Sequence, residues 1–68
     1  MLEKRSIRLL GHQTSIALEP EFWAALEAIA RAETAPLPAI IARVDRTRTP
    51  DQPLASALRV HALRQSRA

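Results

Sequence analysis

The spacing of apolar residues changes once, early in the chain. Within residues 14–18 the larger apolar side chains, Ile16 and Leu18, occupy every second position, which is the period of a strand. From Phe22 onward they recur every three or four positions, which is the period of a helix. A proline flanked by two glutamates precedes Phe22, and this combination suits the first turn of a helix. The pattern predicts a strand over 14–18 and a helix over 20–32.

Two further segments, 38–46 and 54–65, also have helical spacing. Pro36 separates the first of them from the preceding helix, because a proline disfavours helical geometry in the residue before it. The polar, proline-containing stretch 47–53 reads as a linker. Residues 54–68 are therefore expected to form a C-terminal helix and its tail.

Residues 1–12 carry several basic side chains and are expected to form an irregular arm, with at most a short extended piece over 6–10. The single glycine, Gly11, marks a turn or a bulge. The chain is therefore predicted to be mostly α-helical with one short strand.

An unpaired strand exposes backbone donors and acceptors that need partners. No second strand of matching quality is visible, so we expect the strand to pair with its twin in a second copy, which gives an intertwined homodimer with a two-stranded antiparallel ribbon. The predicted dimer core consists of Thr14, Ile16, Leu18, Phe22, Leu26, Ile40, Ile41 and Val44.

Size and composition change this picture only slightly. A chain of 68 residues buries a small core, and the absence of cysteine leaves self-association as the way to strengthen it. With 47% hydrophobic and 25% charged residues it resembles an ordinary folded domain. Neither a membrane span nor a secretory signal is apparent, so a cytoplasmic location is expected. The two histidines are isolated, and no nucleophile lies beside a base in the sequence. We therefore expect no metal site, no cofactor and no enzymatic activity.

The segments "TSIALEPEFWAALEAIA" and "LPAIIARVD" resemble the core of the ribbon-helix-helix family, to which the Arc and Met repressors belong. The resemblance covers residues 13–46. The basic start and the tail "LASALRVHALRQ" resemble a small bacterial subgroup of that family with an extra C-terminal helix. The family implies an obligate dimer that lays its ribbon in the major groove of DNA, where alternate strand residues touch base edges.

Carried over to this chain, the base-contacting residues are Gln13, Ser15 and Ala17. Ala17 departs from the polar residue that the family usually has there. The family also holds a phosphate at the start of its second helix, where Leu37 and Ala39 keep backbone donors although Pro36 and Pro38 do not. The remaining phosphate contacts expected from the basic arm are Lys4, Arg5, Arg8 and His12.

Two functions are compatible with these features. The first is a dimeric DNA-binding protein, a transcriptional regulator that binds double-stranded DNA. The alternative is a protein-interaction module, either antitoxin-like or an accessory subunit, that uses the same dimeric fold. Ala17 and the two prolines favour the alternative, with Trp23 or the helix over 54–65 as the surface for the partner.

Overall fold

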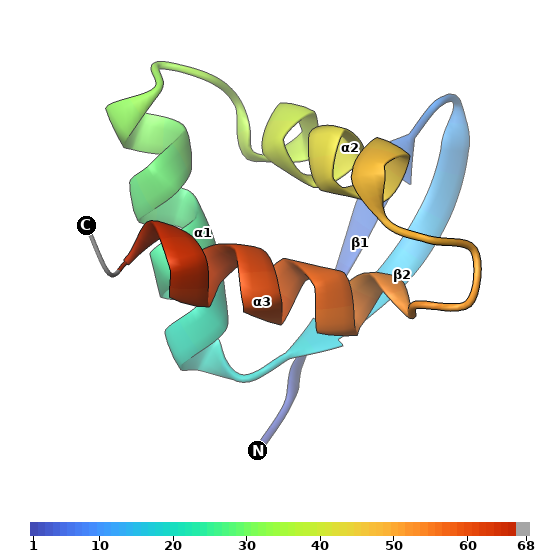
Figure 1. Cartoon of the computed structure of the whole chain (residues 1–68), viewed down its shortest axis with the longest axis horizontal. Coiled ribbons are helices and arrows are strands. Elements are labelled where there is room, and N and C mark those ends of the chain that lie inside the picture. The colour runs from blue at the N-terminus through green and yellow to red at the C-terminus, as the bar shows by residue number, and fades with distance from the viewer. Residues whose placement is uncertain (67–68) are drawn as a thin grey trace.

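The computed structural model describes residues 1–66, and its first feature is a β-hairpin (Figure 1). Strand β1 (Glu3–Leu9) pairs antiparallel with strand β2 (His12–Leu18), in a register that places Leu9 opposite His12. The loop between them is Leu10-Gly11, and both residues have positive φ, 51° and 81°. Two positive φ angles in a two-residue loop are the signature of a type I′ turn, whose twist matches that of paired strands.

This hairpin corrects the prediction of a single strand preceded by an irregular arm. Ile7 and Leu9 alternate with polar residues, as a strand requires, but the inward positions before them hold Glu3 and Arg5 and conceal the alternation. The two strands of the ribbon therefore come from one chain, and β2 keeps a second edge that is unpaired in this sheet. The homodimer itself stays a prediction.

Three helices follow the hairpin: α1 (Pro20–Ala32), α2 (Leu37–Thr47) and α3 (Leu54–Gln65). All three predicted helices are confirmed, with α2 longer by one residue at each end. In α1, Pro20 occupies the first turn, where its missing N–H breaks no hydrogen bond. The prediction of a ribbon-helix-helix arrangement with an additional C-terminal helix is confirmed.

A tight motif ends α1 and turns the chain toward α2. Thr34 has a φ of 53°, its N–H donates to the Arg31 carbonyl (3.1 Å), and the Ala35 N–H donates to the Ala30 carbonyl (2.9 Å). These two bonds define a Schellman motif, in which glycine is the usual residue at the left-handed position. A β-branched threonine there is strained.

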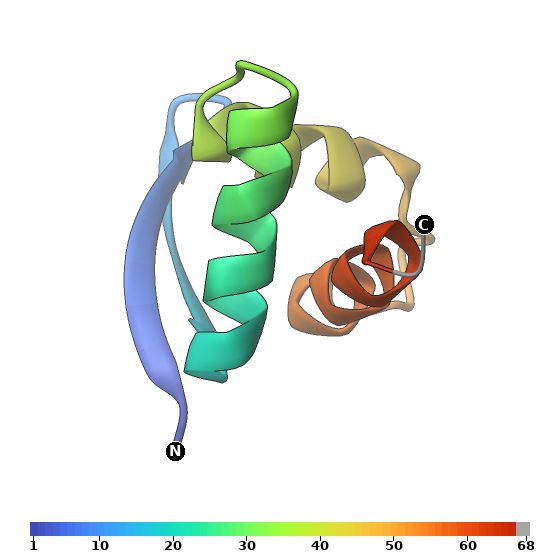
Figure 2. The ribbon, with the colours of Figure 1, turned by 90° about the vertical axis from the view of Figure 1, so that its left-hand side faces the viewer.

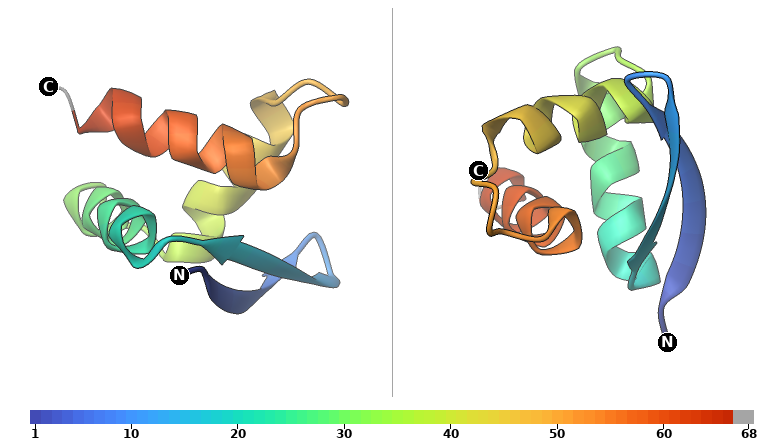
Figure 3. Two further views of the ribbon diagram at one scale, coloured as in Figure 1. Left: turned by 90° about the horizontal axis from the view of Figure 1, so that it is seen from below. Right: turned by 90° about the vertical axis from the view of Figure 1, so that its right-hand side faces the viewer.

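All three helices lie on one side of the ribbon (Figure 2 and the right-hand view of Figure 3). Helix α1 lies between the ribbon and α3, and α3 also contacts α2 and β2. The fully buried larger side chains are Leu18, Trp23, Leu26, Ile40, Ile41 and Leu58. Because the core lies entirely on the helical side, the opposite face of the ribbon is open to solvent.

Most of the residues predicted to form a dimer core are already buried within this one chain, and their part in a dimer stays a prediction. Six of the eight are buried, while Thr14 and Phe22 are half-buried.

Among residues 1–66, no helix has both the length and the apolar character needed to cross a bilayer.

Candidate nucleic-acid interface

The two faces of the ribbon differ in chemistry because side chains alternate along each strand. The inner face carries the apolar residues that contact the helices, with Ile7 and Leu9 from β1 and Ile16 and Leu18 from β2. The outer face consists of Lys4, Ser6, Arg8, Gln13, Ser15 and Ala17. Five of these six are exposed and Ala17 is half-buried.

The register pairs the outer-face residues across the strands: Lys4 with Ala17, Ser6 with Ser15, and Arg8 with Gln13. The three residues predicted to touch bases therefore share one open face, and β1 adds three more to it. Ser6 was not among the predicted site residues. The alternation of polar Lys4, Ser6 and Arg8 with apolar Ile7 and Leu9 was the signal that could have revealed it.

Two hydrogen bonds orient side chains on this face. The Gln13 amide nitrogen donates to the Ser6 hydroxyl, which holds the amide across the ribbon. The Arg8 guanidinium donates to the carbonyl oxygen of Gly11 at 3.3 Å, which draws it toward the turn. His12, another predicted phosphate contact, is exposed beside the turn on the opposite side of β2 from Gln13.

The charge on the outer face is available to a ligand. Lys4 and Arg8 form no ion pair with any residue in the range 1–66, and the face contains no carboxylate. Several other arginines in that range have acidic partners, as in the pairs Arg43–Glu33, Arg48–Asp45 and Arg59–Glu19, whereas Arg31, Arg46 and Arg64 of the helices form no ion pair within residues 1–66. The outer face is thus a basic, hydrogen-bonding surface.

Arg5 lies on the other face. Its Nε and Nη1 contact carboxylate oxygens of Glu3 (2.7 Å) and Glu27 (2.8 Å), and its Cζ lies 4.6 Å from the centre of the Trp23 ring. The hydrogen bond from Arg5 lowers the pKa of the Glu27 carboxyl. The structure therefore places Arg5 between β1 and α1, apart from Lys4 and Arg8, with which it was grouped as a phosphate contact.

Trp23 completes this cluster. Its indole Nε1 donates to the Glu3 carbonyl oxygen at 2.8 Å, and the side chain is only 1% exposed. The expectation that Trp23 could present a surface to a protein partner is wrong, because its ring lies between the ribbon and the rest of the core. Its ring is part of the joint between β1 and α1.

The start of α2, where a phosphate was predicted to bind, has few free donors. Pro36 and Pro38 have no N–H. The Ala39 N–H already donates to the Pro36 carbonyl at 3.0 Å. The Leu37 N–H has no backbone acceptor within residues 1–66 and is the donor that remains.

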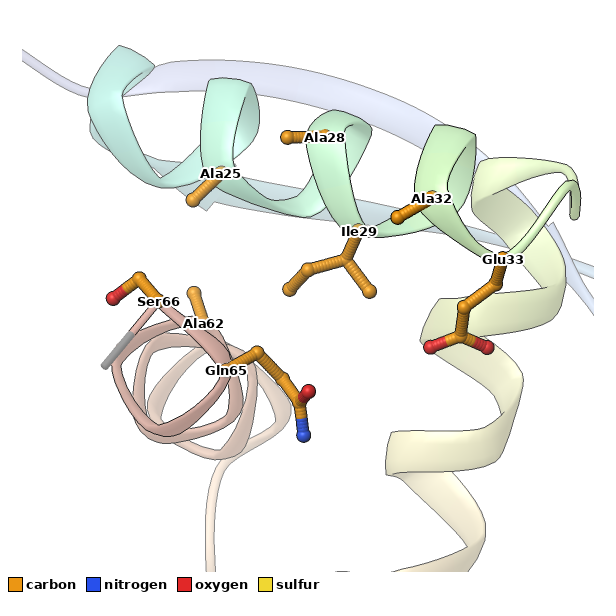
Figure 4. A pocket seen from close by; sticks show the side chains of 8 residues that line it. All are labelled: Ala25, Ala28, Ile29, Ala32, Glu33, Ala62, Gln65 and Ser66. Carbon is orange, nitrogen blue, oxygen red and sulfur yellow. The ribbon is translucent and has the colours of Figure 1, made fainter. Parts of the chain in front are cut away.

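A groove of about 340 Å³ lies between α1 and the C-terminal end of α3 (Figure 4). Its lining consists mainly of small apolar side chains: Ala25, Ala28, Ile29, Ala32 and Ala62, with Glu33, Gln65 and Ser66. It holds no histidine, and within residues 1–66 no three potential metal ligands come together. Its chemistry is that of a contact surface.

His61 of α3 is half-buried and lines a second groove together with Val44 and Ala57. Burial, and then the nearby Arg43, lower the pKa of its imidazole, and its Nε2 has no hydrogen-bond partner within the described residues. Its partly buried position favours the neutral form.

A two-stranded antiparallel ribbon with a basic outer face, followed by two helices, defines a class of non-enzymatic DNA-binding regulator folds. The chain belongs to the ribbon-helix-helix family, because the family model described as "Ribbon-helix-helix domain" matches residues 2–66. The matched range includes β1 and α3 as well as residues 13–46. No curated protein and no solved structure matches the chain.

Proposed function

We propose that this protein is a homodimeric, DNA-binding regulator of transcription that inserts the outer face of its ribbon into the major groove. The observation that carries the proposal is that face itself, which combines two unpaired cations with hydrogen-bonding side chains and has no carboxylate. The major groove has the width to admit a two-stranded ribbon, and base edges there present a distinguishable set of donors and acceptors. As a bacterial regulator it would act in the cytoplasm, where the DNA lies.

The proposed roles follow from chemistry at each position. Lys4 supplies a phosphate contact at one end of the ribbon, since an ammonium is a compact point charge. Gln13 and Ser15 supply hydrogen bonds to bases, and Ala17 supplies methyl contact, for instance to thymine. The free N–H of Leu37 adds at most one backbone donor for a phosphate.

Titration of a labelled duplex at 50 and 200 mM salt tests the proposal. Raising the salt from 50 to 200 mM should weaken binding by a factor of roughly 3.5 for each phosphate contact in the complex. Lys4→Ala should remove one such contact per chain and lower the salt dependence for every sequence alike. Absence of binding at low salt, or binding that salt leaves unchanged, would reject a DNA-binding role.

Homodimer formation is tested by sedimentation at micromolar concentration. Exposed apolar side chains remain on the chain, including Leu10 (77% exposed) and Leu63 (57% exposed). Since both strands of the ribbon come from one chain, a second copy must pack through surfaces of this kind or through a ribbon edge. A single species with the mass of one chain would reject the dimer.

A second function, a module that binds another protein, is favoured by the apolar groove between α1 and α3. Ala32→Arg places a charge in this groove and leaves the ribbon unchanged, so it should release a protein partner without affecting DNA. Lys4→Ala should weaken DNA binding and leave the protein partner bound. Co-purification of both variants from the native host separates the two functions, and a chain recovered alone in each case would reject the protein-binding module.

A further inference from the structure

The second groove, of about 310 Å³, lies between the C-terminal half of α2 and helix α3. Val44 of α2 and Ala57 of α3, both buried, give it an apolar part. No residue of the ribbon lines it, and α1 lies between the ribbon and α3 (Figure 2). A molecule bound in this groove therefore leaves the outer face of the ribbon open.

The ionisable side chains that line this groove are all basic. Arg48 directly follows α2, while His61 and Arg64 are three residues apart on one face of α3. Gln52 and Gln65 add side-chain amides. Within the described residues no carboxylate lines the groove, so an anion that enters it meets cations and hydrogen-bond donors without an acidic side chain to repel it.

The two arginines offer their charges in different ways. The Nε of Arg48 donates to the Asp45 carboxylate at 2.7 Å and its Nη1 donates to the Gln52 carbonyl oxygen at 2.7 Å, which fixes the guanidinium and leaves Nη2 without a partner in the range 1–66. Arg64 forms no ion pair in that range. A fixed donor reduces the entropy lost on binding, and an unpaired cation attracts an anion with its full charge.

The imidazole of His61 has a polar atom that the protein does not satisfy. Its Nε2 is shielded from solvent and has no hydrogen-bond partner among residues 1–66. The charged groups around the ring are Arg43 and Arg48 beside it, Glu33 at the end of α1, and Arg64 on its own helix. Burial and then Arg43 lower the pKa of His61, and Glu33 opposes them. An anion in the groove would stabilise the imidazolium and raise this pKa.

We propose that the groove between α2 and α3 is a binding site for a small molecule with a carboxylate or phosphate group, which is held by Arg48 and Arg64 and has His61 as its third basic neighbour. The volume of the groove is at the small end of the range for ligand pockets. The ligand and a proton on His61 stabilise each other, so binding strengthens as the pH falls. The site is independent of DNA binding by the ribbon.

NMR of the two histidine rings between pH 5 and pH 8 tests the proposal. Sodium phosphate and sodium succinate are added in separate titrations, with sodium chloride at equal ionic strength as the baseline, and the two arms show which oxyanion group the site accepts. His12 lies beside the hairpin turn, outside the groove, and serves as the internal reference. At least one of the two anions should shift the His61 signals saturably and raise the pKa of His61 by about 0.5–1, a roughly 3- to 10-fold coupling between anion and proton.

Arg64→Ala and Arg46→Ala are a matched pair of variants. Each removes an arginine that lies in the last turn of its helix and forms no ion pair within residues 1–66, but only Arg64 lines the groove. Arg64→Ala should weaken binding of the anion by about 10-fold or more, and Arg46→Ala should change it by less than about twofold.

Three results would overturn the site. The first is that neither anion shifts the His61 signals beyond the chloride baseline. The second is that His12 responds as strongly as His61. The third is an equal loss of binding in both variants, because this would reduce the effect to the net charge of the chain.

Discussion

Lys4 and Arg5 are consecutive residues of β1 on opposite faces of the ribbon, so replacing each by alanine should change a different property. Arg5 is part of the joint with α1 through its contact with Trp23, 4.6 Å from the ring centre, and its side chain is 31% exposed. A cation–π contact contributes about 0.5–1 kcal/mol when exposed and about 2 kcal/mol when desolvated. The flanking ion pairs are too exposed to add much.

We therefore expect Arg5→Ala to lower the free energy of unfolding by about 1–2 kcal/mol, which corresponds to a fall in Tm of roughly 4–16 °C for a domain of this size. Lys4→Ala should stay within about 0.5 kcal/mol of the unmodified chain. Urea unfolding followed by fluorescence measures both at one fixed protein concentration. Trp23 is the single tryptophan and there is no tyrosine, so the signal reports the joint between the ribbon and α1.

DNA titration completes the comparison. Lys4→Ala should reduce the slope of log K against log salt by about 0.9 per contact, whereas Arg5→Ala, measured at a temperature where it is folded, should leave that slope unchanged. A reduced slope in Arg5→Ala, together with unchanged stability, would refute this assignment of faces. Arg5 would then contact phosphate, as the sequence alone had suggested, and the ribbon would have a different register.

The other predictions concern strained backbone positions and a half-buried imidazole. Thr34→Gly should raise the free energy of unfolding by about 0.5–1 kcal/mol, because it relieves a β-branched residue at positive φ, and a lower Tm would contradict the Schellman geometry. Leu10→Asn should stabilise by a similar amount, about 0.5–1 kcal/mol, since asparagine tolerates this position of a type I′ turn; equal or lower stability in thermal melts would count against that turn. The pKa of His61 is lower in the folded chain than in the unfolded chain, so as the pH falls the unfolded chain binds a proton at His61 before the folded chain does. The contribution of His61 to the free energy of unfolding is therefore fully present above about pH 6.5, and it declines as the pH falls from there toward the lowered pKa. His61→Gln should flatten the dependence of stability on pH in this window, and an unchanged profile would assign the effect to another group.

The helices were predictable because local signals and the apolar period agree on them. For α1 both the start at Pro20 and the end at Ala32 follow from the sequence, although the structure shows that Thr34, and not only Pro36, shapes the exit. The first strand was missed for a physical reason. The inner positions at the start of β1 hold Glu3 and Arg5, which form an ion pair with each other and both contact Trp23. Because these inner residues are charged, the start of the strand has no alternation of apolar and polar residues in the sequence.

The candidate site was predictable only in part, and the missing information was the register of the hairpin. Alternation along β2 was enough to place Gln13, Ser15 and Ala17 on one face. Before them the sequence indicated an irregular arm with at most a short extended piece over 6–10, so it could not assign Arg5 and Arg8 to different faces. Pairing β1 with β2 separates the two arginines, because residues three apart in a strand lie on opposite faces.

The register of the hairpin ties the DNA-facing surface to the core. Side chains alternate with a period of two, so a slip of β1 by one residue would turn Ile7 and Leu9 out to solvent and turn Lys4 and Arg8 toward the helices. The first change loses apolar burial and the second buries unpaired cations, and each is costly. The type I′ turn, with its two-residue loop, permits only the observed pairing. The same interactions that stabilise the fold therefore hold Arg8 opposite Gln13 on the outer face.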